Sequence, residues 1–366
     1  MGFKCGIIGL PNVGKSTLFN ALTSSNKAEA ANYPFATIEP NIGRVPVPDI
    51  RLKKLSKINT SKKTIPTFMD FVDIAGLVKG ASKGEGLGNK FLSHIRGVDA
   101  ILHIVRCFEN ENISHVSNNI DPINDIETIN TELLLADLEI LLKRKESLIK
   151  KSKSGDMESE KILNLVNCII ENMEKGEDYI KNIKGNSEKQ IINDLNLITY
   201  KPLMYVCNVD ERSIMNGNNL SKKVKEKIEN KKNVVVNISA SVESQIANLE
   251  KKEDQQLFLE DLNLKEPALN KVIRSGYDLL NLITFFTTGF KETRAWTIEK
   301  DSKASNAAGK IHTDFEKGFI RAETISYNDY IKFNGELGCK ENGKLRQEGK
   351  DYKVEDGDIF NFLFNV

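Results

Sequence analysis

A glycine-rich segment near the N-terminus has the residue types and spacing of a phosphate-binding loop. Residues 9–17 read GLPNVGKST and follow an apolar run that begins at Phe3. Backbone N–H groups of such a loop point at phosphate oxygens, and the positive end of the following helix adds to the attraction. We expect Lys15 to act in catalysis as a point charge on the β- and γ-phosphates, and the Ser16 hydroxyl to bind Mg²⁺. The predicted nucleotide-binding residues of this loop are Asn12, Val13, Gly14, Lys15, Ser16 and Thr17.

Two residues outside the loop are expected to complete the Mg²⁺ site. Asp73 ends a second apolar run and begins the sequence DIAG, so it has the place of a Walker B carboxylate that holds Mg²⁺ through a water molecule. Thr37, in the segment YPFATIEP, has the place of a switch threonine that binds the ion directly. The assignment of Thr37 depends on the other two motifs, because a single threonine in a loop indicates nothing by itself.

The residue that orients the attacking water differs from the usual one. Translation-type GTPases have a glutamine or similar residue just after the DxxG motif, whereas this chain has Leu77, which has no hydrogen-bonding side-chain atom. We expect His115 to replace it, because imidazole can accept a proton or orient water near neutral pH. A loop histidine that is merely solvated is the open alternative. The other histidines, His94, His103 and His312, are expected to be structural, or for His312 part of a partner surface.

The motif that selects the purine base also departs from the usual pattern. GTPases have [NT]KxD after a strand, and the aspartate accepts hydrogen bonds from guanine; the corresponding residues here are Asn208, Val209, Asp210 and Glu211. Losing a designed pair of hydrogen bonds can cost specificity on the order of 10⁴, so we expect adenine binding or poor discrimination between purines. Val209 is then expected to pack on the base, with Asn208 at its polar edge. The alternative is that Glu211 still reads guanine.

Apolar runs separated by helical segments indicate the elements that position these residues. Residues 16–24 have helical spacing directly after the phosphate loop. Because uninterrupted apolar runs are typical of strands buried on both faces, we predict an α/β fold with a mainly parallel sheet. The predicted strands are 3–9, 67–73, 100–106, 202–208 and 233–239.

Two regions differ in pattern from this sheet. Between about residues 126 and 198, apolar residues recur at steps of three and four on both sides of the polar segment 152–156, which predicts two long antiparallel helices. From residue 283 onward the chain predicts a small α+β domain, with one short helix over 307–317. Its apolar ending, 359–366, is expected to be a paired strand, because a frayed tail would not need alternating aromatic residues.

Length and composition indicate a globular protein of two or three domains. The chain has 366 residues, 40% of them hydrophobic, and its 52 Lys and Arg nearly balance its 51 Asp and Glu. No global field therefore draws it to nucleic acid or to a membrane. The apolar runs are too short to span a bilayer, and the phosphate loop begins too early to leave room for a cleaved signal. We expect a cytoplasmic protein, with its 5 scattered cysteines reduced and structural.

Local basic clusters could still bind RNA phosphates, with a strong salt dependence. One cluster lies at the tip of the predicted helical hairpin, and a second follows residue 50. A solvated helix face is the open alternative for both. The first cluster is Lys143, Arg144, Lys145, Lys150, Lys151 and Lys153, and the second is Arg51, Lys53, Lys54, Lys57, Lys62 and Lys63.

Several motifs taken together resemble one family, the YchF or Obg-like ATPases within the P-loop GTPase superclass. They are the MGFKCGI start, the phosphate loop, DIAGLVKGAS, VRCFEN and AGKIHTDFEKGF, and the resemblance spans nearly the whole chain. It implies a P-loop nucleotide-binding domain over 1–125 and 199–282. It further implies an inserted helical hairpin over 126–198 and a C-terminal TGS domain of β-grasp type over 283–366.

The resemblance also implies chemistry. In this family ATP is preferred or tolerated alongside GTP, a hydrophobic residue at the Leu77 position replaces the glutamine, and a histidine matching His115 is the substitute. The Mg²⁺ ligands carry over to Ser16 and Thr37, and the base contact carries over to Val209.

The main hypothesis is a monomeric Mg²⁺-dependent ATPase, binding GTP comparably or more weakly. Its nucleotide state is expected to control binding to ribosomes, a ribosomal subunit, RNA or translation factors. Asn12 also permits K⁺ beside the phosphates, a hypothesis that hydrolysis rates in K⁺ and Na⁺ test. Two alternatives stay open: a GTPase of ordinary specificity, and a nucleotide-stabilised binding scaffold with negligible turnover, which the loss of glutamine at Leu77 favours.

Overall fold

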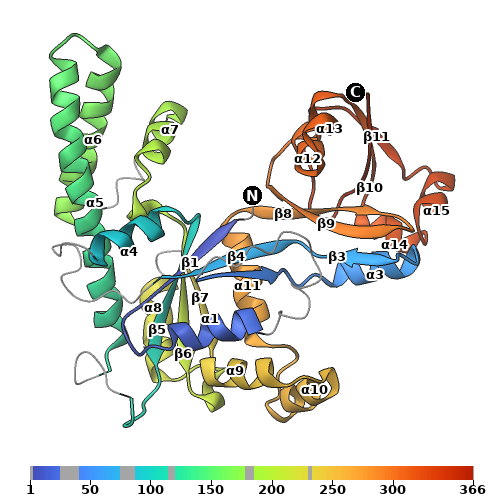
Figure 1. Cartoon of the computed structure of the whole chain (residues 1–366), viewed down its shortest axis with the longest axis horizontal. Coiled ribbons are helices and arrows are strands. Elements are labelled where there is room, and N and C mark those ends of the chain that lie inside the picture. Colours follow the sequence, from blue (N-terminus) through green and yellow to red (C-terminus); the bar gives the residue numbers. More distant parts are fainter. Residues whose placement is uncertain are drawn as a thin grey trace. The chain divides into compact units, whose positions relative to one another are not determined.

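The computed structural model describes residues 3–24, 41–74, 87–113, 120–177, 185–229 and 233–365 (Figure 1). Thr37, Leu77 and His115, which the sequence singles out, lie outside these ranges. The chain divides into two compact units. We call residues 4–19 and 72–244 the P-loop unit, and residues 1–3, 20–71 and 245–366 the C-terminal unit.

A parallel sheet forms the centre of the P-loop unit. Its strands β1 (Lys4–Ile8), β5 (Ala100–Cys107), β6 (Leu203–Val209) and β7 (Val234–Ile238) pair in this order, all in parallel. All eight positions of β5 are buried, as expected for an apolar strand covered on both faces. Strand β4 (Phe68–Asp73) ends in this unit, where the Ile74 N–H donates to the Ile7 carbonyl at 3.3 Å. The five strands predicted from apolar runs are therefore confirmed.

Helices connect these strands. The phosphate loop leads directly into α1, as its spacing predicts. The elements are α1 (Lys15–Ser24), α4 (Leu87–Arg96), α8 (Asn219–Glu229), α9 (Ala240–Asn248) and the short 3₁₀ turns Ile198–Tyr200 and Glu211–Ser213.

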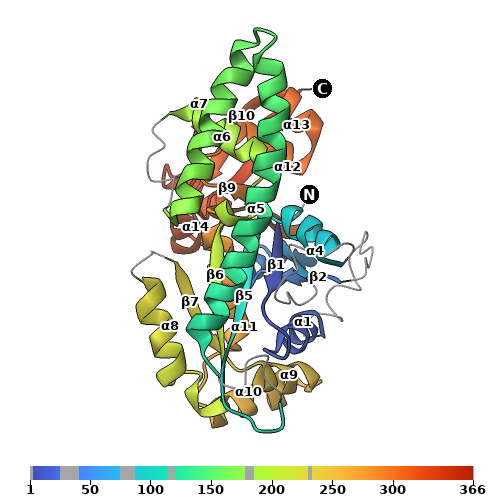
Figure 2. The same cartoon turned by 90° about the vertical axis from the view of Figure 1, so that its left-hand side faces the viewer.

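The helical insertion consists of α5 (Pro122–Ser152), α6 (Met157–Lys175) and α7 (Asn186–Leu195). Figure 2 shows α5 and α6 side by side, which confirms the predicted hairpin, whereas the third helix was not predicted. Asp121 caps α5 with Pro122 at its first turn, and Asp156 caps α6, so both starts follow known capping chemistry. Their facing sides share one apolar core that includes Leu141, Val166 and Ile169.

A buried carboxylate fastens the insertion to the rest of the P-loop unit. Asp137 of α5 is 0% exposed and accepts hydrogen bonds from the backbone N–H groups of Ile198 and Thr199, at 3.1 and 2.8 Å. Arg96 of α4 approaches the same carboxylate at 3.1 Å. A buried charge is tolerated only when it is paired and hydrogen-bonded, and here its partners come from the segments before and after the insertion.

The C-terminal unit has a six-stranded sheet of its own in the order β11-β10-β12-β8-β9-β3. Strands β8 and β9 are antiparallel, whereas β12 runs parallel to β8 and β3 parallel to β9. The sequence did not predict β3, whose partner in this sheet lies far along the chain. The limits assigned above to the nucleotide-binding, hairpin and TGS domains stay a prediction. The strands are β3 (Lys63–Ile65), β8 (Leu282–Thr288), β9 (Glu292–Glu299), β10 (Phe319–Ile325), β11 (Arg346–Glu348) and β12 (Ile359–Phe364).

Helices cover both faces of this sheet. One face packs on α12 and α13, around Phe285, Phe360 and Phe362, and the other packs on α3, α14 and α15, around Leu55 and Phe286. The remaining elements of this unit are β2 (Ile42–Pro46), α3 (Ile50–Ile58), α10 (Lys252–Asp261), α11 (Ala268–Leu279), α12 (Ala304–Ile311), α13 (Thr313–Lys317), α14 (Tyr327–Lys332) and α15 (Glu336–Glu341).

The single helix predicted over 307–317 is wrong, because two helices meet at His312. This residue has extended backbone angles, φ −159° and ψ 145°, and its Nδ1 accepts a hydrogen bond from the Asp314 N–H at 3.2 Å. A side chain that caps a new helix competes with continuation of the old one. His312 is thus a capping residue between α12 and α13.

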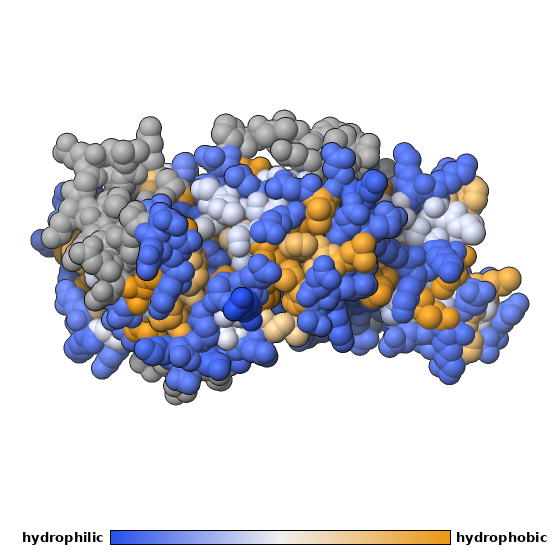
Figure 3. Space-filling view, turned by 90° about the horizontal axis from the view of Figure 1, so that it is seen from below, coloured by the Kyte–Doolittle hydropathy of each residue, from blue (hydrophilic) through white to orange (hydrophobic). Residues whose placement is uncertain are grey.

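The surface and the cysteines can be described from the structure. Figure 3 shows hydrophilic side chains over most of the face in view, with hydrophobic side chains in smaller areas between them. All five cysteines are free, and four of them are buried. Among the described residues, no helix has both the length and the apolar character needed to cross a membrane.

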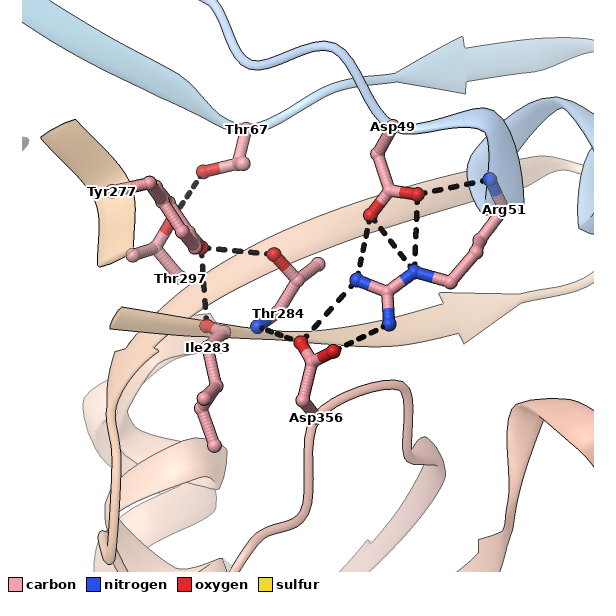
Figure 4. Close-up of polar contacts among 8 residues, drawn as sticks. All are labelled: Asp49, Arg51, Thr67, Tyr277, Ile283, Thr284, Thr297 and Asp356. Atoms are coloured by element: carbon pink, nitrogen blue, oxygen red, sulfur yellow. Dashed lines mark hydrogen bonds and ion pairs between the residues drawn. The ribbon is translucent and has the colours of Figure 1, made fainter. Parts of the chain in front are cut away.

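A hydrogen-bonded charge cluster ties α3 to the C-terminal sheet (Figure 4). Arg51 donates from Nε and Nη2 to the carboxylate of Asp49 and from Nη1 to Asp356 at 2.7 Å. Asp356 in turn accepts from the Thr284 N–H of β8 at 2.9 Å. Burial alone would lower the pKa of Arg51, but the two carboxylates outweigh it and raise the pKa overall. The guanidinium therefore stays charged and joins segments that are distant in sequence.

Replacing Arg51 with methionine should destabilise the C-terminal unit. The change removes charged hydrogen bonds from a side chain that is 24% exposed, so the free energy of unfolding should fall by about 2 kcal/mol. Urea unfolding of the full chain measures this loss. As a control, Lys303→Met breaks the exposed pair with Asp351 in the same unit and should cost less than about 1 kcal/mol. Equal costs for the two variants would contradict the assigned role.

Candidate functional site

The backbone of the phosphate loop needs glycine at two places. A Cβ on Gly9 would lie 2.6 Å from the Ile104 carbonyl oxygen of β5, so the loop can leave β1 only without a side chain there. Gly14 has φ +100°, and a Cβ on it would lie 2.4 Å from Nδ2 of Asn208. Asn12 also has positive φ, at 61°, a conformation that asparagine tolerates better than most residues. The loop is thus a tight turn held against the neighbouring strands.

Lys15 lies over this loop. Its side chain is largely buried, and Nζ donates to the carbonyl oxygens of Gly9 and Leu10 at 3.0 and 2.8 Å. Burial lowers the pKa of Lys15, while the negative charge of Asp73 acts in the opposite direction. Burial likewise raises the pKa of Asp73, and Lys15 opposes that shift. The two residues named for phosphate and metal binding are therefore close enough to influence each other.

Asn208 connects three parts of the site. This residue of β6 is 5% exposed; its Nδ2 donates to the Val13 carbonyl and its Oδ1 accepts from the Ala240 N–H, both at 2.9 Å. The side chain therefore links the phosphate loop to the start of α9. A contact between Asn208 and a purine base stays a prediction. The structure shows that both ends of its amide already bind backbone groups.

The rest of the base-reading segment lies at the end of β6. Val209 is 2% exposed, and Glu211 is exposed at the start of a 3₁₀ turn. Asp210 accepts from Ser213 and Asn218; burial raises its pKa, but these hydrogen bonds outweigh it and lower the pKa overall. The asparagine and the acidic residues thus have separate structural surroundings, although they are adjacent in sequence.

The residues expected to hold Mg²⁺ fit an ion that keeps most of its water. Ser16 is exposed at the second position of α1, and Asp73 is half-buried at the end of β4. Among the described residues no cluster of three or more His, Cys, Asp or Glu could hold a metal. Mg²⁺ is usually bound by one or two protein oxygens together with phosphate oxygens and water, which is the set that Ser16 and Asp73 offer.

The chain matches known proteins along its whole length. A family model described as a 50S ribosome-binding GTPase matches residues 4–144, and the YchF-GTPase C-terminal model, described as a protein of unknown function, matches residues 282–365. The ribosome-binding ATPase YchF of Escherichia coli O157:H7 is 55% identical over 366 residues and covers 100% of both chains. The protein of the same name from Bacillus subtilis (strain 168) is 50% identical over 369 residues, again with 100% of both chains covered.

A solved structure is also similar to this chain over nearly its whole length. The YchF GTPase of Schizosaccharomyces pombe is similar with a TM-score of 0.88 at 39% identity, over 99% of this chain and 98% of that one. The chain belongs to the YchF family. The α/β fold class inferred from apolar runs and motifs is thereby confirmed, as is the resemblance drawn from the sequence.

Two buried polar residues of this YchF family member were not assigned to the site from sequence. His103 of β5 is 1% exposed and lies beside Tyr205, with ring centroids 5.3 Å apart; burial and the charge of Lys15 lower its pKa to about 3. It is therefore neutral. Arg106, near the end of the same strand, is also 1% exposed. Two sequence signals pointed to Arg106: it is a charged residue near the end of an apolar strand, and it stands in the VRCFEN motif.

Gly14→Ala should abolish most of the nucleotide affinity. The new Cβ would clash with the Asn208 amide at a backbone conformation that alanine disfavours, so the dissociation constant should rise at least about tenfold, or about 1.4 kcal/mol. Titration with a fluorescent nucleotide measures it. The matched control is Gly155→Ala in the α5–α6 turn, also at positive φ but with nothing within 4 Å of a Cβ. Similar affinity in both variants would show that the Gly14 contact does not shape the site.

Proposed function

We propose that this member of the YchF family is a Mg²⁺-dependent nucleoside triphosphatase that hydrolyses ATP and accepts GTP comparably or more weakly. Its nucleotide state would control binding to ribosomes or translation factors. The observation that carries the proposal is the phosphate loop itself. Lys15 donates hydrogen bonds to carbonyl groups of this loop and interacts electrostatically with Asp73. The names of the full-length relatives, ribosome-binding ATPases, support the same function.

Each residue has a chemical task in this proposal. The backbone N–H groups of the loop orient the phosphates, and Lys15 neutralises the charge that develops on them. Ser16, Thr37 and Asp73 would hold Mg²⁺, Asp73 through water, and the ion would supply positive charge that stabilises the phosphates. His115 orients or deprotonates the attacking water. It takes over the task of the usual glutamine, whose position is occupied here by Leu77. K⁺ beside Asn12 is a further part of the proposal.

Base selection follows from the segment at the end of β6. Guanine is normally recognised by an aspartate that accepts two hydrogen bonds, and this chain has Glu211 at that place and Val209 where lysine is usual. Val209 supplies an apolar contact for either purine, and a side chain one methylene longer displaces the carboxylate from the guanine edge. Both changes favour ATP relative to the ordinary GTPases.

ATP should therefore bind at least as tightly as GTP. Titration calorimetry with Mg²⁺ on a single preparation gives both dissociation constants, and steady-state phosphate release gives both turnover rates. Lys15→Ala is the control that should remove binding of both nucleotides. GTP binding tighter than ATP by about tenfold, or 1.4 kcal/mol, would indicate a GTPase of ordinary specificity. Tight binding without turnover would indicate a scaffold.

The ribosome-binding part of the proposal assigns RNA phosphate contacts to the tip of the α5–α6 hairpin. Lys143, Arg144, Lys150 and Lys151 are exposed there. Lys143 has an ion pair with Glu139 at 2.6 Å, a contact between exposed side chains that contributes little. Such a tip can approach a polyanion even though the chain as a whole is nearly neutral.

Removing two tip charges should weaken ribosome binding and flatten its salt dependence. In Lys150→Gln/Lys151→Gln, the slope of log affinity against log salt should fall by about one per lost phosphate contact. Co-sedimentation with ribosomes over a KCl series measures the slope. Lys222→Gln/Lys223→Gln on α8 removes two exposed charges of the same unit and is the matched control. Equal slopes in the two double variants would remove the hairpin tip from the interface.

A further inference from the structure

One buried arginine holds the segment that follows strand β5. The guanidinium of Arg106 donates from Nε to the Phe108 carbonyl at 3.2 Å and from Nη1 to the Ile113 carbonyl at 3.1 Å. Nη2 donates to the Asn110 carbonyl at 3.2 Å. The Phe108 ring also packs on the guanidinium, with 4.7 Å between the ring centroid and Cζ. Three backbone groups of residues 108–113 are thus fixed by a single side chain.

This arrangement needs the shape of arginine. A guanidinium has five N–H donors spread over a rigid plane, whereas the three donors of lysine diverge from a single nitrogen, so lysine cannot reproduce this set of directions. Burial lowers the pKa of Arg106, and the negative charge of Asp125 opposes that shift. Asp125 is itself buried, in the first turn of α5. The guanidinium that holds residues 108–113 therefore also interacts electrostatically with the first turn of α5.

The end of β5, directly before this segment, is connected to a residue of the base-reading motif. Asn218 donates from Nδ2 to the Cys107 carbonyl at 2.6 Å and to the Asp210 carboxylate at 3.3 Å. In the sheet, Arg106 itself pairs in register with Asn208, whose amide holds the phosphate loop. The end of β5, from which the held segment continues, is therefore joined to the end of β6 and, through Asn208, to the phosphate loop.

We propose that Arg106 is a positioning residue for nucleotide hydrolysis, which it supports by holding residues 108–113 directly after β5. This inference rests on the proposed function, because the held segment leads along the chain to His115, the residue assigned there to the attacking water. Arg106 does not contact the nucleotide in this proposal. It acts on the hydrolytic step and leaves ground-state binding largely unchanged.

Arg106→Lys keeps the positive charge but loses the fork of hydrogen bonds. Its kcat for ATP should fall about tenfold to a hundredfold, as misplacement of a reacting group by about 1 Å can cause. Its KM and its nucleotide dissociation constant should change by less than about threefold, because positioning acts on the transition state. Steady-state kinetics and titration measure the two effects separately. A merely structural role would weaken binding and turnover together.

Two comparisons make the test specific. Arg96→Lys changes an arginine of the same unit that also donates to backbone carbonyls, of Asn196 and Ala136, but lies before β5 instead of at its end. Its kcat should stay close to that of the wild type. Asn218→Ala removes, at a half-buried position, the hydrogen bond to the Cys107 carbonyl directly before the held segment, and it should lower kcat in the same direction but less. The second variant keeps the test decisive if Arg106→Lys does not fold.

A double variant separates the inference from the proposed function. If Arg106 acts through His115, its substitution should have little further effect on kcat in a His115→Ala background. Additive losses, or an unchanged kcat in Arg106→Lys and Asn218→Ala beside an active wild type, would overturn the inference alone. Unchanged turnover in His115→Ala would overturn the assigned role of His115, and with it this path of action. A wild type without turnover of either nucleotide would overturn both proposals together.

Discussion

The site depends on one side-chain amide, that of Asn208, which connects the phosphate loop to the start of α9. Both of its ends bind backbone groups, the Val13 carbonyl and the Ala240 N–H. Removing the amide would leave these two groups without their partner in a buried place, which costs more than the net value of the bonds themselves. Gly14 is tied to the same contact, because only a residue without a Cβ fits beside the Asn208 amide.

The residues of the candidate site, and Arg106, lie where parallel strands end. Gly9 follows β1, Asp73 ends β4, Arg106 lies near the end of β5 and Asn208 near the end of β6. Carboxyl ends of parallel strands share one edge of a sheet, and the loops beyond them form the crevice in which α/β proteins bind ligands. The apolar interiors of these strands do no chemistry, but their burial fixes where the polar ends lie. The pattern explains why residues distant in sequence form one site.

The sequence predicted those features that are determined by residues close together in the chain. Five strands of the parallel sheet, the phosphate loop and the α5–α6 hairpin each have a period or a motif of their own, and all of these were predicted. The pairing of β3 with β9 was not, because three residues such as 63–65 contain no signal for a partner more than two hundred positions away. The break at His312 was missed for a similar reason: one capping bond decided between one helix and two.

Within the candidate site, the sequence predicted which residues take part but not which groups their side chains contact. The sequence predicted that Asn208 contacts the purine base. The groups that its amide binds depend on how β6, the phosphate loop and α9 pack together, and no sequence motif contains that information. Helix α5 has a consequence of its own. At 31 residues it is about 46 Å long, and a tilt of about 5° at its base moves its far end by about 4 Å. The first turn of α5 contains Asp125, which interacts electrostatically with Arg106. Binding of a partner at the basic tip would therefore act through the length of the helix on the surroundings of Arg106.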